Sequence, residues 1–257
     1  MTNTGGPLTG IQVVDLTTAV SGPVAAVILA DQGADVIKIE PPGGDFMRAA
    51  GPKTGMNPTF VACNRGKRSM VLDLKQQRAA EIMWRVIESA DVLIQNFRPG
   101  AIERLGFGAS TVAARNPKLV YLSISGVGES GPYSGKRVYD PVIQALGGLA
   151  DIQADPQTGR PRMVRTLIAD KTTAVYAAQA VVAALFSRER SGVGQHIRLS
   201  MLDTLVCYLW PEGMASSALV DTEPETTGSV GTRHDFSYRE WLHNVRRGIE
   251  SRVERIM

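Results

Sequence analysis

Asp170 is the side chain whose position points most directly to chemistry. It follows the apolar run Leu167-Ile168-Ala169 and directly precedes an Ala/Val-rich stretch, residues 171–187, with the composition of a buried helix. This spacing predicts that Asp170 is the N-cap of that helix and accepts a hydrogen bond from a first-turn N–H group. A second role is compatible with capping. A helix N-terminus lowers the pKa of a carboxyl group and keeps it ionised, as a carboxylate nucleophile requires.

A glycine-rich segment, residues 126–131, matches the spacing G-x-G-x-x-G and follows a predicted strand. A dinucleotide site would need a helix to start there, so that its N-terminus could hold the pyrophosphate. Pro132-Tyr133-Ser134-Gly135 follows instead and is typical of a loop. The segment therefore favours a glycine-rich turn over a nicotinamide or flavin site. G-x-S-x-G and P-loop motifs are absent from the sequence.

The histidines and cysteines give no sign of a metal site. His196, His234 and His243 lack cysteines or carboxylates at metal-ligand spacing, which favours a structural role for each. Cys63 and Cys207 match no C-x-x-C pattern, and we expect two buried thiols rather than a disulfide. The sequence therefore predicts no metal cofactor.

The composition is that of a folded protein. Of the 257 residues 44% are hydrophobic and 21% are charged, and the net charge is +3. The basic residues are scattered, which argues against nucleic acid as a partner but suits an anionic cofactor. The N-terminus does not have the pattern of a signal peptide, and no stretch has the ~18 apolar residues that span a bilayer. We therefore expect a cytoplasmic protein without membrane contact.

Short apolar runs alternate with helical patterns along the first 200 residues. Strands are predicted over 11–16, 36–40, 70–72, 92–94, 119–124 and 197–199, and helices over 21–31, 76–89 and 171–187. This order predicts an α/β fold with a Rossmann-like parallel sheet and helices on both faces. Ligands of such sheets lie at the carboxyl ends of strands, so the loops after Leu16, Glu40, Ile94 and Ile124 are candidates for a site.

The composition changes near the C-terminus. Residues 226–232 are rich in Gly, Ser and Thr, and residues 234–257 have the pattern of an amphipathic helix with a solvated, arginine-rich face. We predict two parts: a cofactor-binding Rossmann-like large domain over 1–205, and a linker helix with an atypical C-terminal segment over 206–257.

Thirteen short stretches in order resemble the class III CoA-transferases, the family of formyl-CoA transferase, carnitine CoA-transferase and α-methylacyl-CoA racemase. They are residues 10–16, 22–23, 29–40, 64–74, 90–100, 105–106, 125–128, 131–132, 139–140, 144–145, 169–170, 194–195 and 201–203. Each is modest by itself, but together over residues 8–210 they are specific. The resemblance implies coenzyme A as the cofactor, in the large domain of the family fold.

The resemblance also implies site residues. By it, the cofactor lies along Thr18, Ala19, Val20, Asn64, Lys67, Asn96, Phe97, Arg104, Arg137 and Tyr139. Lysine and arginine can pair with the cofactor phosphates, and Phe97 offers an apolar face. Asp170 matches the family nucleophile, which attacks an acyl-CoA thioester to give an acyl-aspartyl anhydride and then an aspartyl-CoA thioester. The substrates would be an acyl-CoA and a carboxylic acid acceptor.

Position 139 separates the branches of the family. The racemases are similar but place a histidine there, and this chain has Tyr139. The pKa of a tyrosine is near 10 in general, too high for a base at neutral pH, which favours a transferase over a racemase.

Family members are longer than this chain. From about Phe236 the residues no longer resemble them, and the small domain with its glycine loop is missing from the sequence, which predicts a C-terminally truncated member. A homo-oligomer is expected from the interlocked family dimer, although truncation weighs against the interlocking. A non-catalytic or partner-dependent CoA-binding fragment is the alternative function, and an acyl-CoA racemase is a third.

Overall fold

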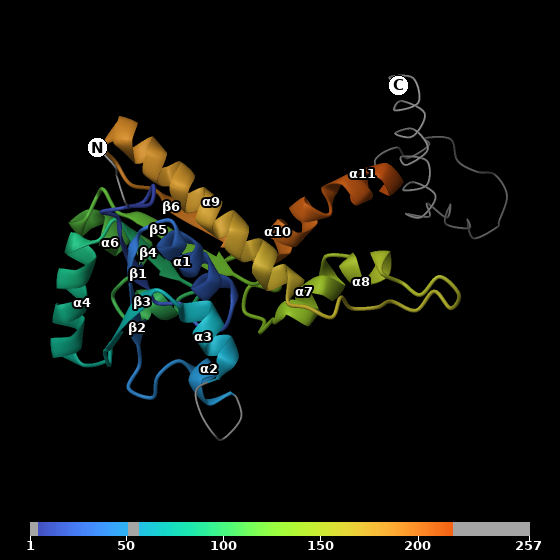
Figure 1. Ribbon diagram of the computed structural model, residues 1–257, viewed down its shortest axis with the longest axis horizontal. Helices are drawn as coiled ribbons and strands as arrows, with labels where there is room; N and C mark the ends of the chain where they lie inside the picture. The colour runs from blue at the N-terminus through green and yellow to red at the C-terminus, as the bar shows by residue number, and fades with distance from the viewer. Residues whose placement is uncertain (1–4, 51–56, 218–257) are drawn as a thin grey trace. The chain divides into compact units, whose positions relative to one another are not determined.

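Six parallel strands form the central sheet of the protein, here a computed structural model that describes residues 5–50 and 57–217, the last four as backbone only. In spatial order the strands are β3 (Lys67–Val71), β2 (Asp35–Glu40), β1 (Gln12–Asp15), β4 (Val92–Gln95), β5 (Val120–Ser125) and β6 (His196–Ser200) (Figure 1). The predicted Rossmann-like parallel sheet is confirmed. The chain order reverses between β1 and β4, and in such sheets the crevice beside this reversal binds ligands.

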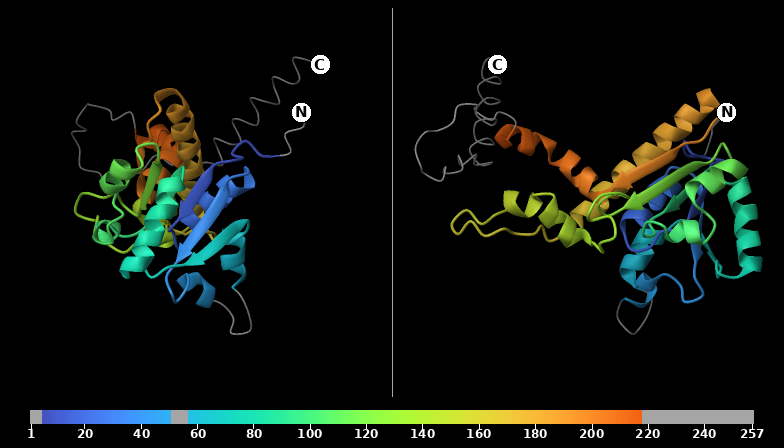
Figure 2. Two further views of the ribbon diagram at one scale, coloured as in Figure 1. Left: turned by 90° about the vertical axis from the view of Figure 1, so that its left-hand side faces the viewer. Right: turned by 180° about the vertical axis from the view of Figure 1, so that it is seen from behind.

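Helices cover both faces of the sheet, as predicted. The described helices are α1 (Ser21–Asp31), α2 (Phe46–Ala49), α3 (Pro58–Asn64), α4 (Gln77–Ser89), α5 (Ala101–Arg104), α6 (Ala109–Arg115), α7 (Asp140–Leu146), α8 (Leu149–Ile152), α9 (Ile168–Ser191), α10 (Met201–Tyr208) and α11 (Trp210–Ser217). α1, α3 and α9 lie on one face, and α4 and α6 lie on the other (Figures 1 and 2). Among the described residues, no helix combines the length and the apolar character needed to cross a membrane.

The two faces are packed by different kinds of side chain. On the α4 face, Met83, Ile87 and Phe107 are fully buried, and the Phe107 ring lies 5.1 Å from that of Trp84. Burial of each such side chain stabilises the fold by about 1.5–3 kcal/mol. On the opposite face α1 packs against α9, and both helices bury alanines, among them Ala25, Ala26, Ala174 and Ala177. Small side chains let these two helices approach closely, with both first turns at the same end of the sheet.

The starts of β3 and α9 each lie three residues before the predicted ones. β3 begins at Lys67 rather than Met70, because Lys67 and Arg68 pair in register with β2 although both are polar. Both charged side chains form ion pairs with residues of other strands of the sheet, Lys67 with Asp15 of β1 and Arg68 with Asp35 of β2. α9 begins at Ile168, so the N-cap is Leu167 and the prediction of Asp170 as N-cap is wrong.

Two further predictions concern loops and thiols. Residues 126–139 contain no helix, which confirms the predicted glycine-rich turn, and Gly128 and Gly131 adopt positive φ angles of 92° and 88°. Cys63 and Cys207 are both free, but Cys207 is exposed rather than buried as predicted, because it lies on an outward-facing position of α10.

The chain divides into two compact units, residues 1–208 and 209–257. The sheet and every helix from α1 to α10 belong to the first unit, and α11 belongs to the second. The amphipathic helix predicted for residues 234–257, with His234 and His243, lies outside the described residues.

Candidate active site

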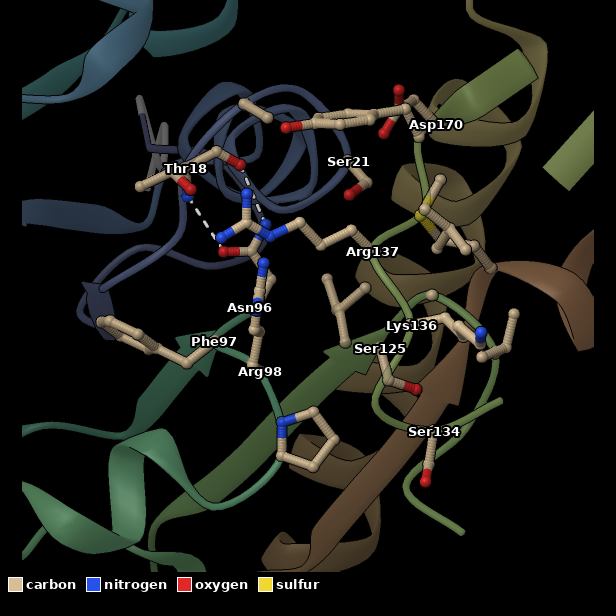
Figure 3. A pocket seen from close by; sticks show the side chains of 18 of the residues that line it. Thr18, Ser21, Asn96, Phe97, Arg98, Ser125, Ser134, Lys136, Arg137 and Asp170 are labelled. Carbon is tan, nitrogen blue, oxygen red and sulfur yellow. Dashed lines mark hydrogen bonds between the residues drawn. The ribbon is translucent and has the colours of Figure 1, made fainter. Parts of the chain in front are cut away.

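A cavity of about 290 Å³ lies at the carboxyl ends of β1, β4 and β5, where the chain order of the sheet reverses (Figure 3). Its walls are the turn after β1, the segment after β4, the loop after β5 and the first turn of α9. The lining includes Thr18, Ala19 and Ser21, residues 96–99, 124–127, 134 and 136–139, Phe46, Asp170 and Met201. The loops after Leu16, Ile94 and Ile124, which were predicted to carry the site, therefore meet here.

The turn after β1 is held by hydrogen bonds on both sides. The Asp15 carboxylate accepts from the Thr17 hydroxyl and, at 2.8 Å, from the Thr17 N–H. The Asn96 side chain accepts from the Thr18 N–H at 3.0 Å and donates to the Thr18 carbonyl at 2.9 Å (Figure 3). Between these anchors Ala19 adopts a φ of 67°, in the left-handed region that non-glycine residues rarely occupy. The turn is thus fixed in one strained conformation at the edge of the cavity.

Asp170 lies in the first turn of α9 and faces the cavity together with Ser21 (Figure 3). Its backbone N–H donates to Asp140 Oδ2 at 2.9 Å. Asp140 is itself buried, and its other carboxylate oxygen accepts from the Gln144 side-chain amide at 2.6 Å. Asp140, from α7, therefore provides the acceptor at the start of α9 that the sequence analysis assigned to Asp170.

The pKa of Asp170 is raised to about 6. Burial is the main cause and the neighbouring Asp140 carboxylate is the second, while the hydroxyl and N–H groups of Ser21 oppose them. The expectation that the helix N-terminus lowers this pKa is wrong, because lost hydration and a like charge outweigh the donor groups. The side chain is still mostly ionised at neutral pH, and a more basic carboxylate is also a better nucleophile.

Three cationic side chains border the cavity: Arg98 after β4, and Lys136 and Arg137 in the loop after β5. Arg137 extends across the cavity toward Asn96 (Figure 3). Within the part of the chain that the structure describes, none of the three forms an ion pair, whereas Arg48 and Arg188 pair with carboxylates elsewhere. The cavity thus has positive charge available for an anionic ligand.

The structure brings most of the predicted site residues together. Those that line the cavity are Thr18, Ala19, Asn96, Phe97, Arg137, Tyr139 and Asp170, and Tyr139 is 65% exposed. Val20 is buried at the N-cap of α1 and Arg104 is exposed at the end of α5, both outside the lining. The loop after Glu40 contributes only Phe46, from α2.

Asn64 and Lys67 lie in a buried polar cluster beside the cavity rather than in its wall. The Lys67 ammonium donates to Asp15 Oδ2 at 2.7 Å, to the Pro23 carbonyl at 2.9 Å and to Asn64 Oδ1 at 2.9 Å. These contacts use all three of its N–H groups. Contact of either residue with a cofactor phosphate stays a prediction.

Among the lining residues that were not predicted as site residues are Ser21, Phe46, Arg98 and Lys136. Three of them, Ser21, Arg98 and Lys136, are each adjacent in sequence to a predicted site residue, so the predicted positions indicated the right segments. Phe46 reaches the cavity from a short helix after β2, and no local pattern marks it.

His196 lies away from this cavity. Its Nε2 is 2.9 Å from the Ser123 hydroxyl, and its ring packs edge-on against Tyr121. Within residues 5–50 and 57–217, no group of three or more His, Cys, Asp or Glu side chains is arranged as metal ligands would be.

Comparison with known proteins points to one family. CoA-transferase family III matches residues 8–239. The acetyl-CoA:oxalate CoA-transferase of Acetobacter aceti is 39% identical over 90% of this chain and 59% of its own length. The succinate–glutarate CoA-transferase of Agrobacterium fabrum is 40% identical over 83% of this chain and 56% of its own length.

Solved structures agree with the sequence matches. A CAIB/BAIF family protein from Brucella suis superposes with a TM-score of 0.79 at 36% identity, over 84% of this chain and 59% of that one. Rv3272 from Mycobacterium tuberculosis gives a TM-score of 0.77 at 36% identity, over 82% and 59% of the two chains. The chain therefore spans less than two thirds of the length of these relatives.

Proposed function

Because the chain belongs to CoA-transferase family III, we propose that it transfers coenzyme A between an acyl-CoA and a carboxylic acid, with Asp170 as the acyl-accepting carboxylate. One observation supports this most directly. Asp170, with a pKa of about 6, lines the same cavity as Arg98, Lys136 and Arg137. A nucleophilic carboxylate and cations for a phosphate-bearing thioester thus occupy one crevice.

Coenzyme A would enter with its phosphates near the cations and its sulfur near Asp170. Arginine and lysine side chains without ion-pair partners gain charge-assisted hydrogen bonds when phosphates approach. The Phe97 ring and the Val127 and Val138 side chains offer apolar contact to the less polar part of the cofactor. Asn96 has its amide committed to Thr18, so it would act by holding the turn rather than by binding the cofactor directly.

In the first chemical step an Asp170 carboxylate oxygen attacks the thioester carbonyl carbon. The carbon–sulfur bond breaks, the thiolate of coenzyme A leaves, and a mixed acyl-aspartyl anhydride forms. Ser21 is placed to donate to the Asp170 carboxylate and to orient it for this attack. Basicity raised by burial and by Asp140 favours the attack.

The later steps reuse the same atoms. The thiolate attacks the aspartyl carbonyl carbon, releases the donor acid and leaves an aspartyl-CoA thioester. The acceptor carboxylate then attacks this thioester, and the thiolate returns to the new acyl group, which frees Asp170. No redox change and no net proton transfer are needed. The relatives are named for oxalate, succinate and glutarate, so short dicarboxylic acids are the first acceptors to test.

Mass spectrometry of the intact protein mixed with acetyl-CoA and succinyl-CoA tests this proposal. We expect a covalent acyl or CoA adduct on the wild-type chain and on Asp73→Ala, a control carboxylate in the loop between β3 and α4. Asp170→Ala should lose the adduct and keep its affinity for CoA within about threefold, because the cations that would pair with the phosphates are unchanged. An adduct that persists in Asp170→Ala would refute the role of this residue.

A second candidate is CoA binding without transfer by this chain alone. The observation that favours it is that the chain covers 59% or less of the first relatives, so groups outside it could complete their sites. Bound CoA without adduct in the wild-type chain would support this candidate. Tyr139 argues against a racemase, because a tyrosine is a poor base at neutral pH. Observed exchange of the α-proton of a 2-methylacyl-CoA with solvent would support a racemase instead.

A further inference from the structure

Lys38 is a fully buried lysine that the proposed chemistry does not use. It lies on β2, and 2% of its side chain is exposed. Removing an ammonium group from water is costly unless it is paired and hydrogen-bonded, so its contacts show why it is retained.

The Lys38 ammonium contacts two segments that are distant in sequence. Nζ donates to the Thr17 carbonyl at 2.6 Å, and it lies 3.0 Å from Asp45 Oδ2 as an ion pair without hydrogen-bond geometry. Asp45 is buried as well. Each partner of Lys38 directly precedes a residue of the cavity wall, Thr17 before Thr18 and Asp45 before Phe46.

Other groups hold each segment separately. Asp15 and Asn96 fix the turn after β1, as described above, but neither reaches α2. On the other side, Asp45 Oδ1 accepts from the Met47 N–H at 2.9 Å, and the Asp45 N–H donates to Glu40 at 2.9 Å. Among the contacts within the described residues, Lys38 is the side chain that joins the two segments.

We propose that Lys38 is a positioning residue for acyl-CoA binding, which fixes the Thr17–Ala19 turn relative to the Asp45–Phe46 segment. The turn supplies Thr18 and Ala19 to the lining of the cavity in which Asp170 lies, and the second segment supplies Phe46. The inference rests on the function proposed for this site. Without the ammonium, the Asp45 carboxylate would be buried and unpaired. It would turn toward water, and Phe46 would move with it.

Four variants test the coupling: Lys38→Met, Asp45→Asn, the double variant, and Arg188→Met as matched control. Arg188 forms a largely buried ion pair with Asp91, and neither residue lines the cavity. The readouts are CoA affinity by calorimetry, and the rate of adduct formation as a function of acetyl-CoA concentration. Asp45→Asn keeps an oxygen for the Met47 N–H while it removes the charge.

We expect Lys38→Met and Asp45→Asn each to weaken CoA affinity by about tenfold, a size typical of displaced binding groups, with the maximal adduct rate within about threefold of wild type. The double variant should be about as weak as each single variant, rather than about a hundredfold weaker than wild type, because both changes remove the same bridge and their effects do not add. Arg188→Met should change affinity by less than about twofold, since distant sites act independently.

Three results would overturn the inference. One is a loss of affinity in Arg188→Met equal to that in Lys38→Met, which would mean general destabilisation. Another is a double variant about a hundredfold weaker than wild type, since additive losses would mean that Lys38 and Asp45 act independently. If Lys38→Met does not fold, Asp45→Asn becomes the deciding variant, and wild-type CoA affinity in Asp45→Asn would then overturn the inference. A wild-type chain that binds no CoA is a different outcome, because it refutes the proposed function itself and the inference with it.

Discussion

Replacing Asp170 with asparagine should stabilise the protein at neutral pH and weaken it as a catalyst. The pKa of Asp170 rises from an ordinary value of 3.8 to about 6 on folding, through burial first and the Asp140 carboxylate second. The folded chain therefore holds a proton more tightly than the unfolded chain. Its contribution to stability is complete below about pH 4 and is lost as the pH rises through about 6. Asparagine has no charge to desolvate.

The size of the effect follows from the two pKa values. A difference of about two pH units corresponds to about 3 kcal/mol at full ionisation, since one unit is about 1.4 kcal/mol. The free energy of unfolding of Asp170→Asn relative to wild type should therefore increase by about 2–3 kcal/mol between pH 4 and pH 8. Most of that change should occur between pH 4 and pH 6, where only the unfolded chain has lost the proton.

Urea denaturation of both proteins at a series of pH values measures this difference. Asp155→Asn is a control of opposite sign. The N–H groups of Thr158 and Gln157 lower the pKa of Asp155, so the wild-type chain should gain stability relative to that variant as the pH rises. A difference between Asp170→Asn and wild type that stays constant from pH 4 to pH 8 would show that Asp170 is hydrated and distant from Asp140, contrary to the structure.

The remaining predictions concern the neighbours of the site and the core. Asp140→Asn should move the pH midpoint of adduct formation below about 6, because it removes the negative charge beside Asp170; an unchanged single-turnover profile would leave burial as the sole cause. Lys67→Met should lower the free energy of unfolding, measured in urea, by about 3–5 kcal/mol, because it leaves the buried Asp15 carboxylate without its ion-pair partner. Unchanged stability together with lost CoA affinity would instead indicate that Lys67 binds the cofactor. Met83→Ala should lower the free energy of unfolding by about 2–5 kcal/mol in the same assay, while the adduct yield at 15 °C stays at the wild-type level. Loss of the adduct in a folded variant would contradict the separation of α4 from the site.

The order of strands and helices could be predicted from the sequence because its signals are local. The strands β1, β2, β4 and β5 are four to six residues long and rich in apolar, mostly β-branched side chains, and the α4 stripe repeats at helical spacing. β3 was placed three residues late, since its first residues are charged and only their partners across the sheet explain their burial.

The loops that form most of the cavity could also be predicted from the sequence. The carboxyl ends of parallel strands meet at one edge, so the loops after Leu16, Ile94 and Ile124 could be grouped before any distance was known. The individual residues Thr18, Asn96, Arg137 and Asp170 came from the family resemblance, and the structure places all four in the lining of one cavity.

Only the tertiary structure determined how the charged side chains are paired and how their pKa values are shifted. Asp140 and Asp170 are 30 residues apart, and Lys67 and Asp15 are 52 apart, yet each pair is in direct contact. A pKa depends on burial and on neighbouring charges, and both arise from contacts between distant segments rather than from local sequence. The sequence therefore identified the carboxylate, while the fold determined that its pKa lies near 6, that Asp140 caps its helix and that Lys67 is paired inside the protein.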